Sequence, residues 1–190
     1  LDTVFREIKN IIIPSNYIQI DNIIFLGMGG SAVGAEIVID LINENIRKPI
    51  ALIRSYNLPG YVNNKSLVIA SSYSGETEET IEAFENAAKK GAKLIGITTG
   101  GKIASVCRKY KVPYYEIKYG CEPRAALGYS LGAEIALLSK IKLIDISELD
   151  LEKAIKSLDK LIEKIKPNIE SNQNFAKQLA EKIYLKIPII

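Results

Sequence analysis

The sequence Ser71-Ser72-Tyr73-Ser74-Gly75-Glu76-Thr77-Glu78-Glu79-Thr80 is the most informative part of the chain. The apolar, β-branched run at residues 67–70 before it is typical of a buried strand. After it, apolar residues recur at helical spacing from position 81 to position 88. We therefore predict a turn between a strand and a helix, with the helix beginning near Glu76.

Three hydroxyl groups, those of Ser72, Ser74 and Thr77, lie within this turn. A helix N-terminus offers unpaired N–H groups and a positive dipole end, and hydroxyl groups donate to phosphate oxygens without adding charge. The alternative is that Ser74 or Thr77 only caps the helix, with Glu79 or Thr80 closing a capping box. A cap needs one hydroxyl, so three of them in one turn favour a phosphate-binding loop.

Strands and helices alternate along most of the chain. Further strands are predicted at residues 22–26, 50–53, 93–98 and 112–117, and helices at 3–12, 33–42 and 103–110. This alternation predicts an α/β fold with a parallel sheet between helices. The last part is predicted to hold helices at 125–143, 151–165 and 174–182, and the start of another strand at 184–190.

A glycine-rich segment, Gly27-Met28-Gly29-Gly30-Ser31, joins the first strand to the next helix. Gly29 and Gly30 let a ligand approach the backbone, and Ser31 offers a hydroxyl beside a helix N-terminus. Together with Ala32 the segment also fits the dinucleotide fingerprint, but Arg54-Ser55 stands where that fingerprint needs an acidic residue. The pattern therefore favours a phosphorylated small molecule over a nicotinamide cofactor.

Arg124 follows Glu122-Pro123 at the start of a predicted long helix. If it faces the same sheet edge, its guanidinium would stabilise negative charge on a bound oxygen. The alternative is a surface ion pair with Glu122 or Glu116.

Composition narrows the function classes. The 190 residues carry a net charge of +3, which is too small to indicate nucleic acid or an anionic membrane as a partner. Without histidine, acid–base chemistry within this chain falls to other side chains, and the two cysteines show no metal-binding or disulfide pattern. No signal peptide or membrane-length apolar run is present, so we expect a cytoplasmic protein with reduced thiols.

The three motifs together resemble the sugar isomerase (SIS) family, in particular its archaeal-type bifunctional phosphoglucose/phosphomannose isomerase branch. They are Gly27-Met28-Gly29-Gly30-Ser31-Ala32, the hydroxyl-rich turn and Pro123-Arg124, and the resemblance covers about residues 20–145. It implies a five-stranded parallel sheet flanked by helices, two such subdomains per subunit, and a homodimer. It further implies that Gly30, Ser31, Ser72, Ser74 and Thr77 surround the phosphosugar and that Arg124 stabilises an enediolate.

The implied reaction interconverts glucose 6-phosphate or mannose 6-phosphate with fructose 6-phosphate and needs no metal or organic cofactor. In that family the glutamate base and the ring-opening histidine belong to the second subdomain. We therefore expect residues 1–146 to be the phosphosugar-binding subdomain and 147–190 to lead into a second one that continues past Ile190. Two alternatives are a non-catalytic phosphosugar sensor and the isomerase half of an amidotransferase, although neither a helix-turn-helix nor a glutaminase domain is visible in this sequence.

Overall fold

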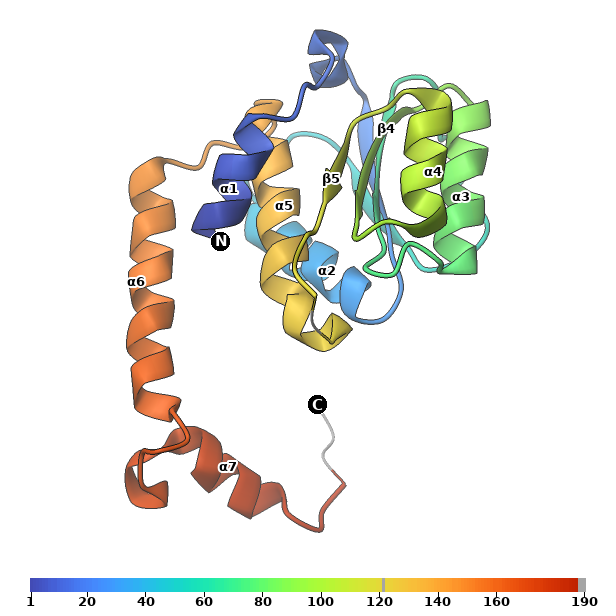
Figure 1. The fold of residues 1–190 in the computed structure, drawn as a ribbon. Coiled ribbons are helices and arrows are strands. Elements are labelled where there is room, and N and C mark those ends of the chain that lie inside the picture. The colour runs from blue at the N-terminus through green and yellow to red at the C-terminus, as the bar shows by residue number, and fades with distance from the viewer. Residues whose placement is uncertain (121, 188–190) are drawn as a thin grey trace. The chain divides into compact units, whose positions relative to one another are not determined.

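The computed structural model of the chain describes residues 1–120 and 122–187, and a parallel sheet lies among the helices of its first 145 residues (Figure 1). The sheet has five strands in the order β2-β1-β3-β4-β5, and every neighbouring pair is parallel. The strands are β1 (Asn22–Leu26), β2 (Ile50–Ile53), β3 (Ser66–Ser71), β4 (Lys93–Thr98) and β5 (Tyr114–Glu116). The predicted α/β fold with a parallel five-stranded sheet is confirmed.

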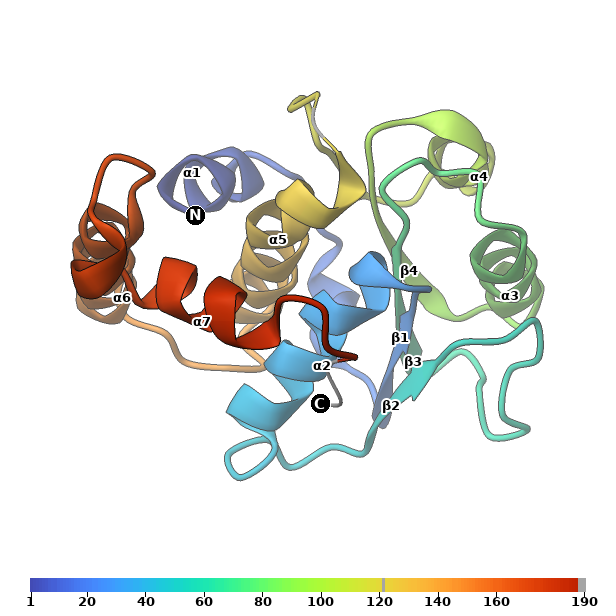
Figure 2. The ribbon, with the colours of Figure 1, turned by 90° about the horizontal axis from the view of Figure 1, so that it is seen from below.

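Helices cover both faces of this sheet (Figure 2). One face packs against α1 (Asp2–Lys9), α2 (Gly30–Ile42) and α5 (Leu127–Lys140). The other face packs against α3 (Glu78–Lys89) and α4 (Gly101–Tyr110). Short 3-10 helices, η1 (Ser15–Ile18) and η2 (Pro123–Ala126), precede β1 and α5.

The strand sequences explain the two cores. Side chains alternate along a strand, so Ile23 and Phe25 of β1 enter the core beneath α2 and α5, whereas Ile24 and Leu26 enter the core beneath α3 and α4. All four are fully buried. A continuous apolar run is the expected pattern for a parallel strand that is covered on both faces.

The residues from Ile146 onward form a separate compact unit, distinct from Leu1–Asp145. It contains α6 (Glu148–Ile165), η3 (Ser171–Gln173) and α7 (Phe175–Ile183). Ser147 opens α6 with a capping box, because its hydroxyl accepts from the Asp150 N–H while the Asp150 carboxylate accepts from the Ser147 N–H. That this unit leads into a second α/β subdomain stays a prediction.

Several predicted helix boundaries differ from the structure: α2, α4 and α6 each begin two or three residues earlier than predicted, at Gly30, Gly101 and Glu148. α3 begins at Glu78, two residues after the predicted start, because Thr77 is extended, with φ −68° and ψ 112°. The predicted helix over 125–143 is a 3-10 turn followed by α5, and it ends before Lys142, which adopts a left-handed φ of 59°. α1 ends at Lys9 rather than continuing to the residues just before Pro14.

The strand predicted at 184–190 is wrong for the residues that the structure describes. Residues 184–186 form a turn and bend after α7, and Leu185 has a left-handed φ of 59°, which is incompatible with an extended strand. Residues 188–190 lie outside the described part of the chain.

Candidate phosphosugar site

Two loops meet at the carboxyl edge of the sheet. The glycine-rich loop follows β1 and leads into α2, and the hydroxyl-rich loop follows β3 and leads into α3. These strands are neighbours, with Leu26 beside Ala70 near their ends. From β1 the chain crosses to β2, which lies on one side of β1, and then to β3, which lies on the other side of β1. The two loops therefore lie at the point where the strand order reverses. Open α/β sheets bind their ligands at such a point.

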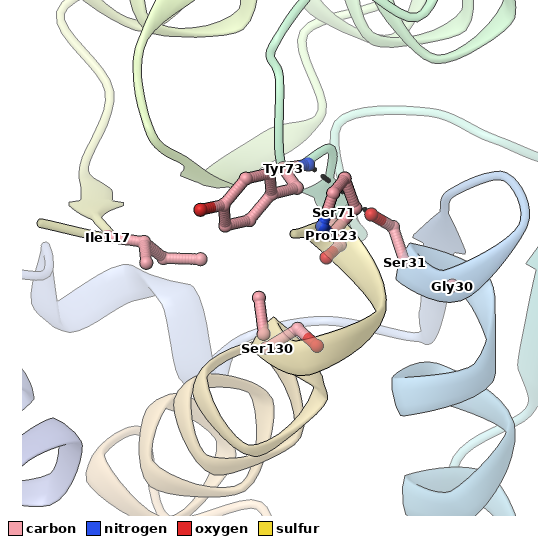
Figure 3. Close-up of a pocket in the computed structure, with 8 residues that line it drawn as sticks. Gly30, Ser31, Ser71, Tyr73, Ile117, Pro123 and Ser130 are labelled. Carbon is pink, nitrogen blue, oxygen red and sulfur yellow. Dashed lines mark hydrogen bonds between the residues drawn. The ribbon is translucent and has the colours of Figure 1, made fainter. Parts of the chain in front are cut away.

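The two loops are in direct contact. The Tyr73 N–H donates to Ser31 Oγ across 3.3 Å, drawn as a dashed line in Figure 3. Gly27 allows this approach, since a Cβ there would lie 3.2 Å from the Ser71 carbonyl oxygen and 3.2 Å from the backbone of Ser31. The prediction that the loops lie side by side is confirmed, and a hydrogen bond joins them.

Within the hydroxyl-rich loop the three hydroxyl groups have different environments. Ser72 is buried, and its Oγ lies 3.1 Å from Thr77 Oγ1 and accepts from the Gly75 N–H at 3.2 Å. Ser74 is exposed, and its Oγ accepts from the Glu76 N–H at 3.2 Å. Thr77 is the N-cap residue of α3, but its side chain makes no capping bond. Thr77 therefore does not cap the helix with its side chain. Its hydroxyl instead bonds to the Ser72 hydroxyl inside the same loop.

A third loop, which follows β4, supports this arrangement. Gly75 has a φ of +70°, and a Cβ there would lie 2.1 Å from the Gly100 carbonyl oxygen, so only glycine fits. The carboxylate of Glu76 accepts from the Lys102 N–H at 3.0 Å and thus caps the N-terminus of α4. Thr99 adds a hydroxyl bond of 2.7 Å to the Tyr73 carbonyl oxygen. The hydroxyl-rich loop is thereby held between the glycine-rich loop and the loop that follows β4.

Backbone donors remain free at this edge. Within the described part of the chain, the N–H groups of Gly30, Ser74 and Thr77 have no hydrogen-bond partner. Gly30 is the first residue of α2, and no side chain caps that helix. Unpaired N–H groups at helix N-termini, together with the helix dipole, favour an anionic ligand.

A pocket opens beside these loops (Figure 3). It is a small hollow that is partly open to solvent, and four segments of the chain contribute to it. Its lining residues are Gly30, Ser31, Ser71, Tyr73, Ile117, Pro123, Ala126 and Ser130. Of the predicted site residues, Gly30 and Ser31 line the pocket itself. Gly29, Ser72, Ser74 and Thr77 lie in the two adjoining loops and not in its wall.

Arg124 lies in η2, the 3-10 turn whose Pro123 and Ala126 line the pocket. Its side chain is 84% exposed, and its guanidinium lies 3.5 Å from the Glu122 carboxylate. The ion pair weighed as an alternative is thus present, and within the described residues the guanidinium makes no second ion pair or hydrogen bond. Its predicted role toward an enediolate stays a prediction.

Tyr73 and Ser130 line the pocket although the sequence did not single them out as ligand-binding residues. Tyr73 lies inside the hydroxyl-rich motif, so its position could have indicated it. Its hydroxyl donates to the Tyr119 carbonyl oxygen at 2.8 Å, and the Tyr119 ring stacks on Tyr129 with centroids 5.0 Å apart. Ser130 carries no sequence signal, because only the packing of α5 against α2 brings it to the site.

Other site classes are less well supported. Among residues 1–120 and 122–187, no cluster of three or more cysteine or acidic side chains has the arrangement of a metal site. None of the helices in that part of the chain is long and apolar enough to span a membrane. Cys107 is fully buried, and burial raises the pKa of its thiol to about 12, which disfavours the nucleophilic thiolate form.

Comparison with known proteins agrees with this geometry. The family profile described as SIS domain matches residues 16–108. The bifunctional phosphoglucose/phosphomannose isomerase of Caldicellulosiruptor bescii is 42% identical over 182 residues, covering 96% of this chain and 54% of that protein. Its counterpart in Aquifex aeolicus is 35% identical over 169 residues, covering 88% of this chain and 49% of that protein.

The fold itself recurs in the crystal structure of a candidate phosphosugar isomerase from Salmonella typhimurium. The TM-score is 0.66 at 21% identity, and the match covers 96% of this chain and 55% of the other. The chain spans about half the length of the curated relatives it matches. It therefore belongs to the SIS family and is related, along nearly its whole length, to bifunctional phosphoglucose/phosphomannose isomerases.

Proposed function

We propose that this chain is the phosphosugar-binding half of a bifunctional phosphoglucose/phosphomannose isomerase. The reaction would interconvert glucose 6-phosphate or mannose 6-phosphate with fructose 6-phosphate, a step shared by glycolysis and gluconeogenesis. The observation that carries the proposal is the contact between the glycine-rich and hydroxyl-rich loops, which leaves unpaired N–H groups at the carboxyl edge of the sheet. Such an edge is suited to a phosphate group attached to a small polar molecule.

The residues of the two loops would contact different groups of the phosphosugar. The N–H groups of Gly30, Ser74 and Thr77 and the exposed hydroxyl of Ser74 would donate to the phosphate oxygens. Ser31, at the pocket wall, would contact the phosphate or a sugar hydroxyl, and Gly29 lets the backbone approach, with its φ of +51°. Ser72 is buried and would act through Thr77 rather than on the ligand.

Arg124 would stabilise the negative charge of an enediolate intermediate. The proton transfer between C1 and C2 needs a carboxylate base, and ring opening needs a proton donor and acceptor. The chain contains no histidine, so a ring-opening histidine would have to come from outside these 190 residues. We accordingly expect phosphosugar binding, but not turnover, from this chain alone, and we propose no metal or organic cofactor.

The finer parts of the proposal concern the whole protein. We propose that residues 147–190 connect to a second SIS subdomain, that subunits pair as homodimers, and that the protein acts in the cytoplasm. The relatives that match nearly the whole chain are about twice as long, which supports a second subdomain.

Titration calorimetry with fructose 6-phosphate tests the binding site. We expect Ser74→Ala to raise the Kd about 10- to 100-fold, because a hydrogen bond to a charged group contributes about 1.5–3 kcal/mol. Ser105→Ala is the matched control, since Ser105 is also exposed but lies one turn into α4. Unchanged affinity in Ser74→Ala would count against the phosphate-binding role of this loop.

The enzyme proposal needs the full natural polypeptide and a coupled assay with both glucose 6-phosphate and mannose 6-phosphate. Activity on both epimers is the expected result. Tight binding of fructose 6-phosphate with no turnover of either epimer would instead establish the sensor alternative.

A further inference from the structure

Glu134 is a buried carboxyl group that the proposed chemistry does not use. It lies in the middle of α5 and is fully buried. Within the described part of the chain, neither of its side-chain oxygens has a hydrogen-bond partner. Buried carboxyl groups are rare unless they are paired, because removing the charge from water is costly. This position therefore needs an explanation.

The space that Glu134 fills exists because residue 34 of α2 is a glycine. A Cβ at Gly34 would lie 3.1 Å from Glu134 Oε2 and 3.1 Å from Ser130 Oγ. The side chains of Glu134 and Ser130 therefore converge on the same point of α2. Gly34 is itself buried, and a Cβ there would also lie 3.4 Å from the Leu131 backbone nitrogen, so α2 and α5 pack closely at this point.

This contact lies one helical turn below the pocket on both helices. On α5, Glu134 follows Ser130 by four residues, and residues spaced in this way share one face of a helix. On α2, Gly34 follows Gly30 in the same way. Ser130 and Gly30 both line the pocket. A change in the spacing of the helices at Gly34 would therefore be transmitted to both walls of the pocket.

We propose that Glu134 is a positioning residue of the pocket, whose side chain holds α2 and α5 at the spacing that lets Ser31 and Ser130 face one ligand. The inference rests on the proposed phosphosugar function for the identity of that ligand. Glu134 does not touch the pocket, so it acts through Gly34 and Ser130 and not on the substrate.

The proposal requires Glu134 to remain a neutral acid. Burial raises its pKa well above the ordinary carboxyl value, and no neighbouring charge contributes to the shift. Tyr17 and Tyr115 are buried in the same core, with their hydroxyls bonded to the Leu94 carbonyl and to Glu7. Apart from Glu134, the charged residues on α5 and on the elements packed against it are all at least partly exposed: Asp2, Arg6, Glu7, Lys9, Glu36, Asp40, Arg124 and Lys140.

The raised pKa sets a direction for the pH dependence. Between the unfolded and the folded pKa of Glu134, the native state holds one proton more than the unfolded state, so stability falls as pH rises. Over that interval the unfolding equilibrium constant grows up to tenfold per pH unit from this group alone. Ionisation within the folded state would push α2 and α5 apart at Gly34 and weaken ligand binding.

Three variants of the chain test this inference by titration with fructose 6-phosphate from pH 6 to pH 9. Glu134→Gln keeps the shape but does not ionise, Glu134→Ala leaves a cavity, and Glu44→Gln changes an exposed glutamate just beyond α2. We expect Glu134→Gln to match the wild-type Kd within about twofold at pH 6 and to bind more tightly than wild type as pH rises. Glu134→Ala should raise the Kd at least fivefold, whereas Glu44→Gln should follow wild type throughout.

The phosphate group of fructose 6-phosphate also titrates in this pH range, but its titration changes the Kd of wild type and of Glu134→Gln equally. The ratio of the two Kd values therefore reports on Glu134 alone. A ratio of wild-type to Glu134→Gln Kd that stays flat with pH, together with unchanged binding by Glu134→Ala, would overturn the inference. If wild type fails to bind fructose 6-phosphate at pH 6, the proposed function fails instead. Urea unfolding then decides the inference, because equal pH dependence of stability in wild type and Glu134→Gln would rule out a buried neutral acid.

Discussion

Replacing Gly75 with alanine is the most direct perturbation of the hydroxyl-rich loop. Gly75 has a φ of +70°, which L-residues rarely adopt. The added Cβ would lie 2.1 Å from the Gly100 carbonyl oxygen, 2.7 Å from Thr98 Oγ1 and 2.9 Å from the Gly100 carbonyl carbon. Two of these three atoms belong to the backbone, so the loop after β4 or the hydroxyl-rich loop itself must move.

Two terms determine how much Gly75→Ala lowers the free energy of unfolding. A left-handed conformation costs an alanine about 1–2 kcal/mol relative to glycine. Forcing a methyl group into a closely packed site costs about 1–3 kcal/mol more. We therefore expect Gly75→Ala to lower the free energy of unfolding by about 2–5 kcal/mol. Because Ser74 and Thr77 flank Gly75, we also expect fructose 6-phosphate binding to weaken beyond detection under conditions where the variant is still folded.

Urea denaturation followed by circular dichroism measures the first effect, and calorimetry measures the second. Gly60→Ala is the matched control, since a Cβ at Gly60 meets nothing within 4 Å and its backbone does not need a positive φ. We expect that control to stay within about 0.5 kcal/mol of wild type. A Gly75→Ala variant that unfolds at the wild-type urea concentration and binds fructose 6-phosphate normally would refute the close packing of the hydroxyl-rich loop against the loop after β4.

Three further predictions follow from burial and hydrogen bonding. Phe84→Ala should lower the free energy of unfolding by about 3–5 kcal/mol in the same denaturation assay, because Phe84 of α3 is fully buried in the core between that helix and the sheet. Ser72→Ala should cost about 1–3 kcal/mol, since it removes the partner of the Thr77 hydroxyl and one acceptor of the Gly75 N–H; wild-type stability would contradict this. Cys107, whose thiol pKa burial raises to about 12, should resist iodoacetamide at pH 8 in the folded chain and react in urea, as peptide mass spectrometry would show. The raised pKa also means that stability falls as pH rises from about 9 toward 12.

The order of strands and helices could be predicted from the sequence because local patterns encode it. Continuous apolar runs such as residues 22–26 indicate strands buried on both faces, and apolar residues at helical spacing indicate the covering helices. The parallel sheet and the position of both ligand loops follow from that alternation alone. Helix boundaries were less accurate, because the start of α3 depends on how Thr77 and Glu76 are held by contacts outside the helix.

The composition of the site could be predicted only in part. Gly30 and Ser31 were expected at the ligand edge and line the pocket. Ser130 was not expected, because nothing in its local sequence marks it, and the packing of two helices brings it there. Arg124 was expected to face the edge, but its exposed guanidinium pairs with Glu122 in this structure.

The sequence by itself determined which segments become strands, which loops carry glycines and hydroxyls, and at which edge of the sheet those loops end. Only the tertiary structure decided which of these groups remain free for a ligand. Tyr73 donates to Ser31 although 42 positions separate them, and Gly34 leaves room for the carboxyl group of Glu134 on another helix. The physical reason is that propensity and periodicity act over a few residues, whereas hydrogen-bond satisfaction and close packing are settled between elements that meet only after folding.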